Sequence, residues 1–115
     1  MKIKTDFVTN SSSTAYIIQN LTNEVKTLVD FVEENPQLIE MFKDQYDWYK
    51  DDPEMTQENL IESARENNFE MRPKESKFCI FGDESGTLIG RVFDYILRDG
   101  GKSKSFEWDF QEYLR

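Results

Sequence analysis

The apolar residues of this chain recur with two different periods, and this change constrains the fold more than any other feature. Between residues 22 and 70 they recur every three or four residues, as in helices with one buried face. Near the end of the chain, Phe106, Trp108 and Phe110 instead alternate with polar residues, as in a strand with one buried face. The sequence therefore predicts an α+β fold.

Three helices are expected in the first half, because each apolar stripe there is bounded by residues that start or stop helices. Asn35-Pro36 separates the first two stripes, and Asp51-Asp52-Pro53 separates the second from the third. The expected ranges are 22–34, capped by Thr22 or Asn23, then 36–49, and then 57–67, capped by Thr56.

The remaining segments predict four strands and a fourth helix. Strands are expected at 14–20, at 69–72 and 77–81 as a hairpin around the turn 73–76, and at 106–111. The fourth helix is expected over 87–98, capped by Ser85 or Thr87 and stopped by Gly100-Gly101. The order is β-α-α-α-β-β-α-β, which predicts a largely antiparallel four-stranded sheet with helices packed on it, in a single domain over residues 1–115. The short glycine link places the aromatic residues of the last strand under the fourth helix.

The negative charge of the chain is concentrated in one stretch. Residues 22–70 hold fourteen Asp and Glu against four Lys and Arg, or −10, while the other 66 residues hold nine acids and ten bases, or +1, which gives the total of −9. Such a surface repels nucleic acid and anionic membranes, so neither is expected as a direct partner. The expected partner is a basic protein surface, and the oligomeric state is not readable from the sequence.

The spacing of these acids identifies candidate binding residues. Glu58, Glu62 and Glu66 repeat every fourth residue, a rise of about 6 Å per step along a helix and comparable to the spacing of nucleic-acid phosphates. Like-charge pairs four residues apart each destabilise a helix by a few tenths of a kcal/mol, so keeping them favours contact with something basic. The alternative is an ordinary solvated face. The predicted binding residues are Glu40, Asp44, Asp47, Asp51, Glu58, Glu62 and Glu66.

Catalytic and metal-binding motifs are not found. The chain has no histidine and one cysteine, which excludes Ser-His-Asp and Cys-His catalysis and thiolate clusters for zinc or iron–sulfur. No catalytic residue, metal ligand or cofactor is therefore assigned. A small carboxylate- or metal-dependent enzyme is one alternative to an interaction protein, and a homo-oligomer built by the C-terminal strand is another.

The location expected from the sequence is the cytoplasm. The first ten residues contain no apolar signal core, and no stretch approaches eighteen apolar residues. Cys79 lies in an apolar run, as expected of a buried thiol in a reducing compartment.

The polar run at residues 9–14 predicts a flexible or turn-forming N-terminal segment, 1–13. The opening MKIKTDFVTNSSSTAYII resembles the opening of many small uncharacterised bacterial and phage-borne proteins, in which Phe-Val-(Thr/Ser)-Asn precedes serines and an apolar strand. The resemblance covers about 18 of 115 residues and implies a bacterial or phage origin, with no activity attached. The function expected is a small acidic interaction protein, in its sharpest form a phage-encoded inhibitor that mimics nucleic acid.

Overall fold

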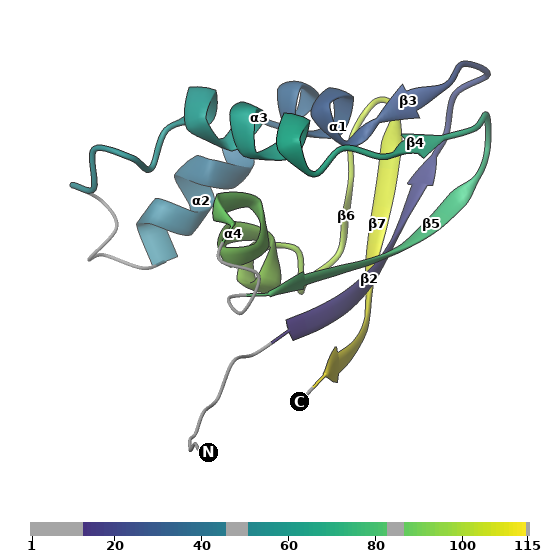
Figure 1. Cartoon of the computed structure of the whole chain (residues 1–115). Helices are drawn as coiled ribbons and strands as arrows, with labels where there is room; N and C mark the ends of the chain where they lie inside the picture. Colours follow the sequence, from purple (N-terminus) through teal and green to yellow (C-terminus); the bar gives the residue numbers. More distant parts are fainter. Residues whose placement is uncertain (1–12, 46–50, 83–86, 115) are drawn as a thin grey trace.

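The computed structural model describes residues 13–45, 51–82 and 87–114 (Figure 1). Within these ranges, helices pack on a four-stranded antiparallel sheet, which confirms the predicted α+β fold. The sheet has the order β5-β2-β7-β6, from β2 (Ser13–Asn20), β5 (Ser76–Gly82), β6 (Gly101–Lys102) and β7 (Phe106–Leu114). A second, two-stranded sheet consists of β3 (Lys26–Thr27) and β4 (Glu70–Met71). The helices are α1 (Leu28–Glu34), α2 (Gln37–Gln45), α3 (Gln57–Glu66) and α4 (Leu88–Ile96).

The helices α3 and α4 each begin directly after a threonine whose hydroxyl caps the first turn. The Thr56 hydroxyl accepts a hydrogen bond from the backbone N–H of Asn59 at 3.1 Å, which confirms Thr56 as the cap of α3. The Thr87 hydroxyl accepts from the N–H of Gly90 at 3.0 Å and caps α4. Ser85, the other candidate for this cap, lies outside the described residues.

The first helix begins later than predicted. α1 starts at Leu28, and neither Thr22 nor Asn23 caps it. Thr27 is the N-cap: its hydroxyl accepts from the N–H of Asp30 at 3.2 Å, and the Asp30 carboxylate accepts from the Thr27 N–H at 2.9 Å. This reciprocal pair is a capping box.

The fully buried side chain of Asn20 explains the later start. Its oxygen accepts from the backbone N–H of Thr22 at 2.9 Å, and its amide donates to the carbonyls of Glu24 at 2.7 Å and Met71 at 3.1 Å. A buried amide needs such partners, and here two of them, Thr22 and Glu24, come from the segment predicted to be the first helical turn. Satisfying Asn20 therefore holds that segment in a turn.

The predicted hairpin between residues 69–72 and 77–81 is wrong. β4 pairs with β3, with Met71 opposite Lys26, whereas β5 pairs with β2 in the main sheet. The chain passes between the two sheets through Lys74, which has a positive φ of 64°. The alternation of apolar residues identified two extended segments, but their partners are set by long-range contacts such as that from Asn20 to Met71.

Aromatic rings join the helices to the sheet. Phe31 of α1 meets Phe93 of α4 at 5.6 Å between centroids, and Phe106 and Trp108 of β7 at 5.3 and 5.2 Å, all edge-to-face. Phe106 and Trp108 are buried and Phe110 is half-buried. The aromatic ring that meets Phe106 and Trp108 comes from α1, while α4 lies mainly against β5, and the predicted contact of these β7 residues with α4 stays a prediction.

The glycine link allows β7 to follow α4 closely. Gly100 has a positive φ of 71°, which favours glycine. A Cβ at Gly101 would lie 2.5 Å from the Cζ2 atom of Trp108, so this position has no room for a side chain. α4 ends at Ile96 with Leu97 as its C-cap, two residues before the predicted end at 98, so the glycines turn the chain after the helix has already ended.

Glu34 ties the end of α1 to the turn before β7. Its carboxylate accepts hydrogen bonds from the Ser103 hydroxyl at 2.5 Å and from the Ser105 N–H at 2.8 Å. Asp30 and Glu34 are a like-charge pair four residues apart on α1, a spacing that by itself destabilises a helix. Both in fact stabilise local structure, Asp30 through the cap of α1 and Glu34 through this turn.

Replacing Phe31 by Ala should lower the free energy of unfolding by about 3–5 kcal/mol, because the ring that joins both layers is lost. Urea unfolding followed by circular dichroism measures the change. Met41→Ala on α2 is the control, since Met41 is 42% exposed and its loss should stay within about 0.5 kcal/mol. An equal decrease in the free energy of unfolding of both variants would contradict the role of Phe31 in joining the helices to the sheet.

The Glu34 contacts predict a pH dependence of stability. Burial raises the pKa of Glu34, but the hydrogen bonds from Ser103 and Ser105 lower it by more, so the pKa lies below its ordinary value of 4.5. The stabilisation is complete above that value and is lost as the pH falls through the lower pKa of the folded state. We expect the difference in unfolding free energy between wild type and Glu34→Gln to shrink over this window. If the difference in unfolding free energy stayed constant with pH, the ionised Glu34 carboxylate would not be the stabilising form.

Candidate functional site

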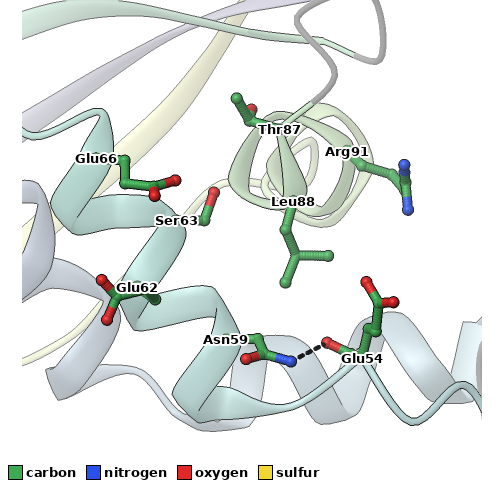
Figure 2. A pocket seen from close by; sticks show the side chains of 8 residues that line it. All are labelled: Glu54, Asn59, Glu62, Ser63, Glu66, Thr87, Leu88 and Arg91. Carbon is green, nitrogen blue, oxygen red and sulfur yellow. Dashed lines mark hydrogen bonds between the residues drawn. The ribbon is translucent and has the colours of Figure 1, made fainter.

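A groove of about 490 Å³ lies between α3 and α4. Figure 2 shows that α3 and the segment before it supply one side, and the first turns of α4 supply the other. The residues that line it are Glu54, Asn59, Glu62, Ser63, Glu66, Thr87, Leu88 and Arg91.

The amphipathic pattern of α3 places the acids on this groove. Leu60 and Ala64 are fully buried in the core, so the helix turns its other side outward. Glu62 and Glu66, one turn apart, are exposed there. Glu54 reaches the same place from the segment before α3, where its carbonyl accepts from the Asn59 amide at 3.0 Å.

A hydrogen bond between the two helices maintains the shape of the groove. The buried Ser63 hydroxyl accepts from the backbone N–H of Ile89 at 3.0 Å. This bond and the Thr87 cap satisfy two N–H groups at the start of α4. Leu88 projects between the helices, as Figure 2 shows, and gives the groove an apolar floor.

The carboxylates around the groove outnumber its cations. The Glu66 carboxylate is directed toward α4, whereas that of Glu62 turns away and meets the Arg65 guanidinium at 2.6 Å. Arg91 is the cation in the lining. Glu54 and Glu66 form no ion pair within the described part of the chain, so their charge is available to a partner.

The structure brings together two of the seven predicted binding residues. Glu62 and Glu66 line the groove, together with Glu54 and Arg91, which were not among the predicted binding residues. Charge spacing along one helix could find the first two, but not residues supplied by a neighbouring loop and helix. The other predicted residues are exposed but do not line it, namely Glu40 and Asp44 on α2, Asp51 before α3 and Glu58 on α3, while Asp47 lies outside the described residues.

A second polar cluster lies between α4 and β2. Asp94 is fully buried, where its carboxylate accepts from the Thr14 hydroxyl at 2.5 Å and lies 3.4 Å from the Arg98 guanidinium. The Tyr16 hydroxyl donates to the Asp94 carbonyl at 2.8 Å, and burial raises the pKa of Tyr16, so it stays a neutral donor. These bonds fasten α4 to the sheet, and we assign the cluster a structural role.

Neither a metal site nor a membrane span is found in the described part of the chain. Within the described ranges, no group of three or more His, Cys, Asp or Glu side chains could hold a metal ion, and no helix is long and apolar enough to cross a membrane. No family model, curated protein or solved structure matches the chain. The opening that resembles bacterial and phage-borne proteins falls mostly on residues 1–12, outside the described part. The groove therefore stands on its geometry alone.

Ser63→Ala should lower the free energy of unfolding by about 1–2 kcal/mol and loosen the start of α4, because the Ile89 N–H loses its acceptor. Urea unfolding and hydrogen exchange at Ile89 measure both effects. Ser76→Ala, at an exposed position in β5, is the matched control and should leave both unchanged. Unchanged exchange at Ile89 in the Ser63 variant would contradict this link between α3 and α4.

Proposed function

We propose that the chain is an interaction protein that binds a basic segment of another protein in the groove between α3 and α4. One observation carries the proposal: a groove with an apolar floor at Leu88 is lined by Glu54, Glu62 and Glu66, and the carboxylates of Glu54 and Glu66 form no ion pair within the described part of the chain. A lysine or arginine side chain matches this combination, since its alkyl stem packs on apolar surface while its charged end stays near carboxylates.

The cost of freeing the carboxylates for such a partner is small. Glu66 and Glu54 have no ion pair to break among the described residues. Glu62 would give up only the pair with Arg65, in which both side chains are well exposed, and exposed pairs contribute little. Attraction to a cation is therefore not offset by a strong internal interaction.

The sharpest form of the proposal is a protein that occupies a nucleic-acid site on its partner. The acids at positions 58, 62 and 66 lie on α3, where the rise is about 6 Å per step. A partner surface built for regularly spaced phosphates would meet regularly spaced carboxylates. Blocking of that surface is then the biological effect, as expected of a phage-encoded inhibitor.

The cytoplasm is the proposed location. Cys79 is buried, and burial raises the pKa of its thiol to about 12, which keeps it protonated and unreactive. An inert single thiol suits a reducing compartment. The enzyme alternative has less support, because the buried carboxylate of Asp94 is already bonded to Thr14 and Arg98.

Capture of partners from a bacterial lysate on immobilised protein tests the proposal. We expect proteins retained at about 50 mM salt to be released by about 500 mM salt, because exposed charges are screened over roughly 8–10 Å at physiological ionic strength. A triple variant, Glu54→Gln, Glu62→Gln and Glu66→Gln, should lose most of this capture. For any purified partner, the same variant should slow association more than it speeds dissociation.

A second triple variant is the matched control for charge. Glu40→Gln, Asp44→Asn and Asp51→Asn remove the same three charges at exposed positions outside the groove. The groove variant should lose more capture than this control does. Equal losses would show that total charge matters and the groove does not, and salt-independent capture would contradict charge-based binding.

A further inference from the structure

The outer side of β5 is not paired with any strand of the described residues. Among these strands β5 lies at the edge of the main sheet, with β2 as its neighbour. The backbone N–H of Asn20 donates to the carbonyl of Glu75 at 2.9 Å, and hydrogen-bonded pairs alternate along an antiparallel ladder. Residues 77, 79 and 81 therefore bond to β2, while the N–H and C=O groups of Phe78 and Ile80 face outward. Such an edge is a template for another strand.

Apolar side chains lie on both faces of this edge. Phe78 and Ile80 are 56% and 54% exposed on the face away from the helices, whereas Cys79 and Phe81 are buried on the other. On the helix side, a recess of about 300 Å³ runs beside the same strand, with walls that include Leu28, Phe69 and Ile89. Apolar side chains are thus open to a partner above and below one unpaired strand.

Charge indicates which partner fits. β5 contains no Asp or Glu, although the chain has a net charge of −9, and its one charged residue is Lys77, whose Nζ lies 5.6 Å from the centre of the Phe69 ring. Two copies of an acidic chain repel each other over most of their surfaces. β5 itself contributes no carboxylate to such a contact. The charges within β5 therefore do not oppose pairing between two copies of this strand.

We propose that β5 pairs in antiparallel fashion with β5 of a second copy of this chain, around a two-fold axis at Cys79. This register places Phe78 of each copy opposite Ile80 of the other and joins their outward N–H and C=O groups. Aromatic residues paired with β-branched residues across strands are favourable, and a two-fold contact uses the same patch on both copies. The sheet becomes continuous across the dimer and leaves the α3–α4 groove of each copy outside the contact strand.

The C-terminal strand, considered above as the oligomer-forming element, is a poorer candidate. β7 lies inside the sheet, paired with β2 along its length and with β6 at its start. The outward face of β7 also carries Glu107 and Asp109, which would bring like charges together in a dimer. The geometry therefore favours β5.

Sedimentation equilibrium tests the dimer and its register. We expect wild type to have twice the chain mass of 13.7 kDa. Ile80→Glu and Phe78→Lys, each alone, should raise the dimer dissociation constant by at least about tenfold, because each buries unpaired charges against an apolar side chain. The double variant should recover most of the affinity, since the register places each introduced lysine opposite an introduced glutamate of the other copy.

Met41→Glu is the control, because Met41 is 42% exposed on α2, away from β5, and should leave the dimer intact. Circular dichroism verifies that each variant is folded; a variant that fails this check is replaced by Ile80→Thr, which should also weaken the dimer. A wild-type monomer at about 1 mM would overturn the proposal. A dimer insensitive to Ile80→Glu, or a double variant as weak as the single ones, would also overturn it.

Discussion

The edge-to-face packing of Phe31 is the contact on which the other layers depend. Its ring meets Phe93 from α4 and Phe106 and Trp108 from β7, so one side chain of the short helix α1 joins the helices to the sheet. Phe93 in turn meets Phe81 of β5 at 5.2 Å. A chain with modest apolar content can form a core in this way because each aromatic side chain buries a large area.

Buried polar groups then decide how the connecting segments run. Asn20 holds the turn before α1 and draws the β4 backbone toward it, Glu34 anchors the turn before β7, and Asp94 fastens α4 to β2. Each satisfies the requirement that a buried donor or acceptor find a partner. The groove depends on the same rule, because the Ser63 hydroxyl that accepts from Ile89 fixes the start of α4 against α3. Much of the polar sequence in the core is therefore structural.

The two proposed interactions use different parts of the surface. The α3–α4 groove combines carboxylates with one leucine and suits a basic segment, whereas β5 offers backbone groups and apolar side chains without an acid. Charge governs the first through long-range attraction that salt weakens. The second depends on strand pairing and apolar contact, which salt affects little. The two surfaces can therefore act at the same time, with a β5 dimer presenting two grooves.

Local sequence determined those elements whose cause lies within a few residues. The caps Thr56 and Thr87 and the alternation of Phe106 and Trp108 all act over one turn of helix or one strand, and each was predictable. The exposure of Glu62 and Glu66 also follows from the period of α3. Tertiary structure decided the late start of α1, the pairing of β4 with β3 and the joining of Glu54 and Arg91 to the groove. These features depend on contacts between residues far apart in the chain, such as Asn20 with Met71 and Ser63 with Ile89. The spacing of residues along the sequence does not predict such contacts.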